Sequence, residues 1–387
     1  MATYKQYENT KGRFWLVRGY LGIDPVTQKQ INIEKRGFKT KKEAQIYFTR
    51  EVNKFNSGGY GGNENKNKNP TYLVLYNEWL EQYKNTVKES TFVKTKQLFS
   101  NNILPIFGNL KIKNITSSFL QKTVNKWHKK FNQYRKVYNY TCKVFDYALV
   151  HGYIADNPKT RVVVPTVKRD YNKKERKKTF YNKSELQEVL EAIKHDGSLE
   201  WYCFFRALAF TGLRRGEMLA LTWADINFND KTLTVNKSLS VGENNRLIVQ
   251  SPKTEASNRT ISLDEKTLAI FKRWRSKQAS LLLAFGFNAL DSKQLVFCKL
   301  DCNKHYYLNK PRSVLTKIVE DNNLPLINIH GFRHTHCSLL FEAGIPIKDV
   351  QFRLGHSDMN TTMNIYAHVT DESKEKSAEL FQAYVNF

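Results

Sequence analysis

The chain has 387 residues, 62 of them Lys or Arg and 36 Asp or Glu, which gives a formal net charge of +26 at pH 7. Hydrophobic residues make up 41% and aromatic residues 13%, which excludes a disordered chain, and no run of about 18 apolar residues is present to span a membrane. Residues 1–30 lack the apolar core of a signal peptide, so we expect a cytoplasmic protein. The large positive surplus indicates a polyanionic partner, most often nucleic acid, rather than a merely solvated basic surface.

The positive charge is unevenly distributed along the chain. Residues 1–69 contain 14 basic and 6 acidic residues, and residues 70–178 contain 22 and 7. Residues 179–387 contain 26 and 23, so this part is nearly neutral. We therefore expect basic binding modules at the front of the chain, attached to a third part with a different task.

Residues 1–56 predict a small α+β domain, a three-stranded sheet plus a helix. Lys11–Gly22 and Thr27–Phe38 are rich in aromatic and branched residues, as strands are. A helix is expected to start at Thr40, because Thr40 and Glu43 have the spacing of a capping box. Residues 57–69 are rich in Gly and Asn and predict a linker.

A basic sheet of this kind can lie in a DNA groove, although a purely structural domain remains the alternative. The candidate DNA contacts in this domain are Arg13, Arg18 and Lys35.

Residues 70–165 predict an all-helical domain. Apolar and aromatic residues recur there at helical spacing, and the exposed positions are mostly lysine, which suits contacts to phosphates. The candidate DNA contacts in this domain are Lys122, Lys126, Lys129 and Lys130. Residues 166–178 predict a second, strongly basic linker, in which Arg169 is a further candidate contact.

Residues 179–387 predict a mainly α-helical domain with a small antiparallel sheet. Asn182 and Glu185 again have capping-box spacing at the start of a helix. Short strands are expected at Thr232–Leu239, Leu247–Gln250 and Arg259–Leu263.

Neither a metal nor another cofactor is expected. The five cysteines are scattered and odd in number, which is typical of reduced thiols, and Cys298, Cys302 and His305 lack a fourth ligand at metal-site spacing. His330 and His334 have the spacing of a zinc protease motif, but Gly331 stands where that motif needs its glutamate.

Four short segments of the third domain carry chemically active residues in a fixed order. They are TGLRRGE with Arg214, SPKT with Lys253, HGFRHTH with His330 and Arg333, and LGH with His356, followed by Tyr366. Each alone has an ordinary structural explanation. Together they combine two guanidiniums to hold a phosphate, groups that transfer protons, and a nucleophile.

This ordered set resembles the catalytic residues of the tyrosine recombinases, the phage integrase family. The resemblance covers residues 180–375 and selects Arg214 rather than Arg215, because the catalytic arginine of the family directly follows TG-x. It implies an arm-type DNA-binding domain over residues 1–56 and a core-site-binding domain over residues 70–165. A catalytic domain over residues 179–387 would end in a tail helix, which docks on a neighbouring subunit or packs within its own.

The chemistry follows from these residue types. Arg214 and Arg333 would stabilise the charge of the pentavalent transition state. Tyr366 has an ordinary pKa of about 10 and therefore needs a base, for which His330 is the candidate. Lys253 is the candidate acid for the 5′-oxygen, and His356 would bond the phosphate or the tyrosine. Glu217 would orient an arginine or a histidine, unless it is simply exposed to solvent.

The resemblance implies an integrase that inserts and excises a prophage or an integrative or conjugative element. It would act through a 3′-phosphotyrosyl intermediate, without metal or ATP, as a homotetramer on double-stranded attachment sites. An excisionase and a host DNA-bending protein are further possible partners. A type IB-like topoisomerase and a non-catalytic DNA-binding protein that kept the fold are the alternatives, against which the three-domain layout and the intact set of six residues argue.

Overall fold

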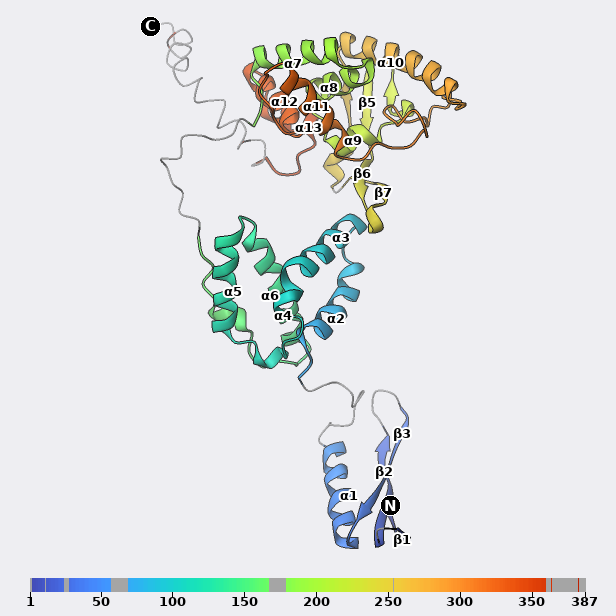
Figure 1. Ribbon diagram of the computed structural model, residues 1–387, viewed down its shortest axis with the longest axis vertical. Coiled ribbons are helices and arrows are strands. Elements are labelled where there is room, and N and C mark those ends of the chain that lie inside the picture. Colours follow the sequence, from blue (N-terminus) through green and yellow to red (C-terminus); the bar gives the residue numbers. More distant parts are fainter. Residues whose placement is uncertain are drawn as a thin grey trace. The chain divides into compact units, whose positions relative to one another are not determined.

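The computed structural model describes residues 2–10, 12–23, 28–56, 69–166, 179–252 and 254–359, together with Met363 and Gln382. Its contacts divide the chain into two compact units, Met1–Val87 with Thr95–Thr166, and Lys88–Lys94 with Val167–Phe387. Figure 1 labels the helices and strands of the chain.

The N-terminal module is an antiparallel sheet with one helix against it. The strands β1 (Ala2–Asn9), β2 (Gly12–Ile23) and β3 (Gln30–Phe38) pair in that order, and α1 spans Lys41–Asn56. The helix packs on β2, where Gly19 leaves room for the Phe48 ring. Within this module, the described residues place no helix over the opposite face of the sheet (Figure 1).

The predicted start of α1 is close to the observed one, with one difference. Thr40 Oγ1 accepts a hydrogen bond from the Glu43 N–H at 3.2 Å, as the capping motif requires. The Glu43 carboxylate instead reaches the N–H of Lys39, at 2.9 Å, one residue before the expected partner.

The second module is entirely helical, as its apolar pattern predicts. Its α-helices are α2 (Tyr72–Lys84), α3 (Glu89–Leu98), α4 (Leu104–Phe107), α5 (Ser117–Lys130) and α6 (Tyr134–Val150). Aromatic side chains fill its core, where the buried hydroxyl of Tyr72 donates to the carbonyl of Thr141 at 3.0 Å.

The third module is mainly helical and contains two small antiparallel sheets. Its α-helices are α7 (Lys183–Asp196), α8 (Leu199–Thr211), α9 (Arg215–Ala220), α10 (Glu265–Ala284), α11 (Lys310–Asp321), α12 (Gly331–Glu342) and α13 (Ile347–Leu354). Its strands are β4 (Ile226–Asn227), β5 (Thr232–Val235), β6 (Ser238–Val241), β7 (Leu247–Gln250) and β8 (Arg259–Ser262). The predicted capping box at α7 is confirmed, since Asn182 and Glu185 exchange two hydrogen bonds of 2.9 Å.

The expected strand Thr232–Leu239 is in fact two strands in different sheets. β5 lies between β4 and β8, whereas β6 pairs with β7 in a separate hairpin. The chain leaves the first sheet near Lys237, whose ammonium turns inward to the Asp225 carboxylate at 2.7 Å and to the Thr222 hydroxyl at 3.1 Å. Because a buried carboxylate needs a charged partner, this ion pair stabilises the break.

In the part of the chain that the structure describes, no helix combines the length and the apolar character that crossing a bilayer requires.

Candidate active site

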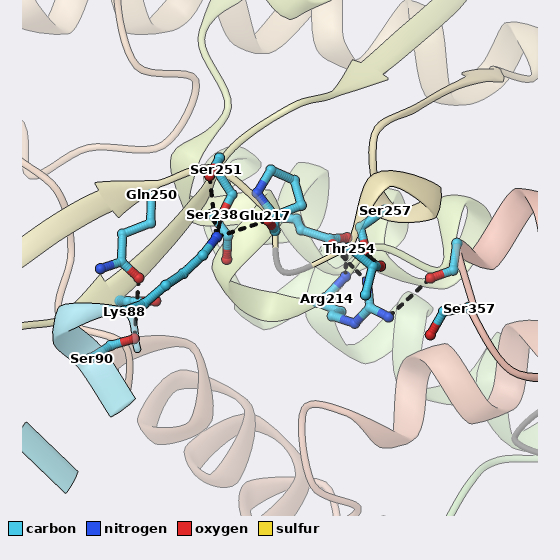
Figure 2. A pocket seen from close by; sticks show the side chains of 13 residues that line it. Lys88, Ser90, Arg214, Glu217, Ser238, Gln250, Ser251, Thr254, Ser257 and Ser357 are labelled. Carbon is cyan, nitrogen blue, oxygen red and sulfur yellow. Dashed lines mark hydrogen bonds and ion pairs between the residues drawn. The ribbon is translucent and has the colours of Figure 1, made fainter. Parts of the chain in front are cut away.

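Arg214 lies between α8 and α9 and is held from two sides. The Glu217 carboxylate accepts hydrogen bonds from the backbone N–H of Arg214 at 2.9 Å and from its Nη1 at 2.7 Å. The Nη2 of Arg214 donates to the carbonyl of Gly355, 141 residues away in the sequence, at 3.2 Å. Figure 2 shows Arg214 and Glu217 in a pocket that Thr254, Ser257 and Ser357 also line, so the guanidinium is fixed but remains accessible.

Arg333 lies on α12 and is 1% exposed. Its Nη1 donates to the carbonyl of Gly212 at 2.8 Å and its Nη2 to that of Leu354 at 2.6 Å. Its Nε is buried and has no hydrogen-bond partner among the described residues. A buried N–H without an acceptor costs about 1–3 kcal/mol, so an acceptor at this atom would be stabilising.

His330 and His356 lie next to these arginines, one before α12 and the other after α13. Partial burial, then the electrostatic effect of His334 and the positive charges of Arg333 and Arg214, lower the pKa of His330 to about 4. Partial burial, then the charges of Arg333 and Arg214 and the electrostatic effect of His330, lower the pKa of His356 to about 3. Both imidazoles are therefore neutral at pH 7 and able to accept a proton.

The hydrogen bonds of Arg214 and Arg333 to the carbonyls of Gly355 and Leu354, together with these electrostatic effects, place four of the six predicted catalytic residues close together. They come from three separate parts of the chain, the α8–α9 junction with Arg214, the start of α12 with His330 and Arg333, and the end of α13 with His356. Lys253 and Tyr366 lie outside the described residues, so their roles stay predictions. The same holds for Arg169 and for the expected tail helix over residues 371–387, of which only Gln382 is described.

Glu217 is 2% exposed and lies between two arginines, which excludes simple solvent exposure. Burial raises the pKa of its carboxyl, but the charges of Arg259 and Arg214 and their hydrogen bonds outweigh it, so the net shift is downward. Glu217 is therefore a carboxylate at neutral pH, in contact with Arg214 as the sequence predicts.

Arg259 was missed by the sequence analysis. It begins β8, and its side chain is 0% exposed while its Nη2 donates to Glu217 at 3.0 Å. The signal was present in the strand, because Arg259 and Ile261 occupy alternate positions and so share the buried face. An arginine on the apolar face of a strand requires a buried acidic partner.

The candidate DNA contacts of the first module lie on different faces of its sheet. Arg18 is exposed on the face opposite α1, where it forms an ion pair with Glu34. Lys35 is paired with Val17, which is buried on the α1 side, so it projects from that side. Arg13 is exposed beside Glu8, with 3.5 Å between its Nε and the carboxylate.

The four candidate lysines of the second module all lie on α5 and are exposed, on the side away from Leu120, Val124 and Trp127. Lys122, Lys126 and Lys130 follow one another at intervals of four residues and line one pocket. This stripe suits a phosphate backbone, and DNA contact by these side chains stays a prediction.

Cys298, Cys302 and His305 were considered as an incomplete zinc site. Cys298 is buried, and its Sγ accepts hydrogen bonds from the side-chain amides of Gln278 and Gln294, each at 3.6 Å. Within the described ranges, no group of three His, Cys, Asp or Glu side chains is arranged to hold a metal ion.

Comparison with known families decides what this site belongs to. The family model described as "Phage integrase family" matches residues 179–373, which is half of the chain. The chain belongs to the phage integrase family. Two further models match its front part, "Phage integrase, N-terminal SAM-like domain" over residues 71–128 and "Arm DNA-binding domain" over residues 4–50.

Relatives of this integrase extend over nearly its whole length. It is 30% identical to a "Tyrosine recombinase XerC-like" protein of Caldanaerobacter subterraneus subsp. tengcongensis, with 98% of each chain covered. It is 26% identical to "Prophage ps2 probable integrase" of Lactococcus lactis subsp. lactis, with 92% of this chain and 94% of the relative covered.

Among solved structures, the Tn1549 transposon integrase in complex with a circular intermediate DNA has the same fold. The match covers 80% of this chain and 99% of the chain in that structure, with a TM-score of 0.65 and 22% sequence identity. The family and its relatives make this chain a tyrosine-type site-specific recombinase, and they do not favour a topoisomerase.

Proposed function

We propose that this integrase cleaves and rejoins DNA at one phosphate held by Arg214 and Arg333, with Tyr366 as the nucleophile. The observation that carries the proposal is the buried Arg333 Nε, which has no acceptor among the described residues and lies beside Arg214. A non-bridging phosphate oxygen supplies that acceptor. Two guanidiniums fixed before the reaction stabilise the added charge of the transition state, an effect worth several kcal/mol in comparable oxyanion sites.

His330 is the proposed general base. Its lowered pKa keeps the imidazole neutral in the free protein, so it is ready to take the phenolic proton of Tyr366. The negative phosphate, once bound, raises the proton affinity of His330 and thereby favours this transfer. Lys253 protonates the departing 5′-oxygen, and His356 bonds the phosphate or the tyrosine. The resulting 3′-phosphotyrosyl bond conserves the energy of the broken linkage, so rejoining requires neither ATP nor a metal.

The division of labour among the modules is also part of the proposal. Residues 1–56 bind arm-type sites and residues 70–165 bind core sites, with linkers over residues 57–69 and 166–178. Residues 179–387 perform the chemistry. This arrangement is supported by the charge distribution and by the descriptions of the matching family models.

The biological role proposed is integration and excision of a prophage or a conjugative element in a bacterial cytoplasm. Solved relatives include a lambda integrase tetramer bound to a Holliday junction, and we propose a tetramer on two DNA duplexes here as well. Reversal of the reaction would involve an excisionase, and DNA bending a host protein.

A suicide DNA substrate with a nick next to the cleavage point tests the proposal. Cleavage releases a short fragment, so the covalent complex accumulates and is seen as a shifted band on a denaturing gel. We expect the complex with the wild type and none with Tyr366→Phe. No complex with the wild type would refute the proposal, and supercoil relaxation without recombinant products would favour the topoisomerase.

A further inference from the structure

Arg259 is a buried cation with all three nitrogen atoms engaged. Its Nη2 donates to Glu217 at 3.0 Å, its Nε to the carbonyl of Arg353 at 2.8 Å, and its Nη1 to that of Ser257 at 3.1 Å. Taking a guanidinium out of water is costly unless its N–H groups find partners, and here each of the three nitrogen atoms donates to an acceptor. The side chain therefore has a single defined position between β8, α9 and the end of α13.

The end of α13 joins Arg259 to both phosphate-binding arginines. Three consecutive carbonyls accept from three guanidiniums, that of Arg353 from Arg259, that of Leu354 from Arg333 and that of Gly355 from Arg214. These carbonyls lie at the negative end of the helix dipole, which favours cations. The next residue is His356, so the turn that the three arginines hold also places this histidine.

Glu217 couples Arg259 to Arg214 electrostatically. The carboxylate contacts both side chains, and the charges of both lower its pKa. With Arg259 present, the three groups carry a net charge of +1 next to the pocket. Without it, Arg214 and Glu217 form a neutral pair, and the buried carboxylate would draw Arg214 away from an incoming phosphate.

We propose that Arg259 is a positioning residue for the recombination reaction. It neutralises Glu217 and fixes the Arg353 carbonyl, and so leaves the positive charge of Arg214 available to the phosphate and holds the turn before His356. The inference rests on the proposed roles of Arg214 and His356. Arg259 itself is enclosed by protein and touches no reacting atom.

Single-turnover cleavage of the suicide substrate at saturating DNA measures the effect. Arg259→Met removes the charge and all three hydrogen bonds, and we expect cleavage about 10- to 100-fold slower, the range in which small misplacements of catalytic groups fall. Arg259→Lys keeps the charge but only part of the bonding, and we expect an intermediate rate. Arg206→Lys is the matched control, because Arg206 is a largely buried arginine of the same domain whose ion pair is with Asp264.

A double variant that also removes the negative charge of Glu217 tests whether Arg259 positions Arg214 or only stabilises the fold. In Arg259→Met with Glu217→Gln, the uncompensated carboxylate is gone, so Arg214 is released and cleavage becomes faster than in Arg259→Met alone. The same rescue is expected to be smaller on a methylphosphonate at the cleavage point, which removes phosphate charge and the need for Arg214.

A double variant as slow as or slower than Arg259→Met would overturn the inference. The inference would also be overturned if the loss of cleavage rate in each full-length variant only matched its loss of folded protein, as measured by thermal unfolding. A wild type that forms no covalent complex would overturn the proposed function as well, whereas a wild-type rate in Arg259→Met would overturn this inference alone.

Discussion

Arg333 donates a 2.6 Å hydrogen bond to the carbonyl of Leu354, the last residue of α13. The bond joins the motif that carries the second arginine to the turn that carries His356, and it is buried. Arg333, which we propose to be catalytic, thus also caps the neighbouring helix, so its position is determined before DNA binds. Preorganisation of this kind lowers the reorganisation needed at the moment of reaction.

Replacement of Arg333 by lysine tests this preorganisation. Lysine keeps the positive charge but has one nitrogen, which cannot reach the Gly212 and Leu354 carbonyls and a phosphate together. We expect single-turnover cleavage to fall at least about 100-fold, the loss typical of removing one oxyanion donor, while core-site binding in a gel-shift assay changes little. Cleavage within a factor of about three of the wild type would show that charge alone suffices.

Gly355 is expected to be irreplaceable for a second reason besides its backbone angle. Its φ is +66°, and a Cβ there would lie 2.9 Å from the Ala256 carbonyl and 3.1 Å from Arg259 Cδ. Gly344 has a φ of +78° but open space around it, which makes it a matched control. Both alanine variants should lose about 1 kcal/mol of stability from the positive φ, and Gly355→Ala should lose more because of these close contacts, as urea unfolding measures. Only Gly355→Ala should also lose cleavage, and equal activity of the two would contradict this account.

The lowered pKa of the buried His336 leads us to expect that the stability of the protein depends on pH. Its Nδ1 lies 2.8 Å from the Ala209 carbonyl and its Nε2 accepts from Arg353 Nε at 3.1 Å. Burial, then the charge of Arg353, lowers its pKa to about 3 from an ordinary 6.5. Below pH 6.5 the unfolded chain therefore binds a proton that the folded chain binds only near pH 3.

The free energy of unfolding should consequently fall as the pH decreases from 6.5 towards 3, by up to about 1.4 kcal/mol per pH unit from this histidine. Urea midpoints of the full chain between pH 4 and 7 measure the slope. His336→Gln, which keeps a donor and an acceptor but does not titrate, should reduce it. An unchanged slope in that variant would assign the acid sensitivity to other groups.

Deletion of residues 1–69 separates the two DNA-binding tasks. The matching arm-domain model ends at residue 50, before the Gly- and Asn-rich segment, and the helical module has a core of its own. We expect the truncated protein to cleave core-site suicide substrates at near the wild-type rate and to fail in integration that depends on distal arm sites. Unchanged integration would refute the proposed role of the first module.

Much of the local structure of this integrase was predictable from its sequence. The capping pair Asn182 and Glu185 and the helical spacing of aromatic residues in the second module are both short-range patterns. Side-chain periodicity and backbone hydrogen bonding within a few residues determine such features.

Other features depended on contacts between residues far apart in the chain. The break between β5 and β6 is stabilised by the ion pair of Lys237 with Asp225, which lies outside the expected strand over residues 232–239. Arg214 meets Gly355 across 141 residues, and Arg259 meets Arg353 across 94. The sequence by itself determined which residues we propose to carry the chemistry. The tertiary structure decided which buried partners hold them, because the cost of burying a charge is met only by groups that folding brings together.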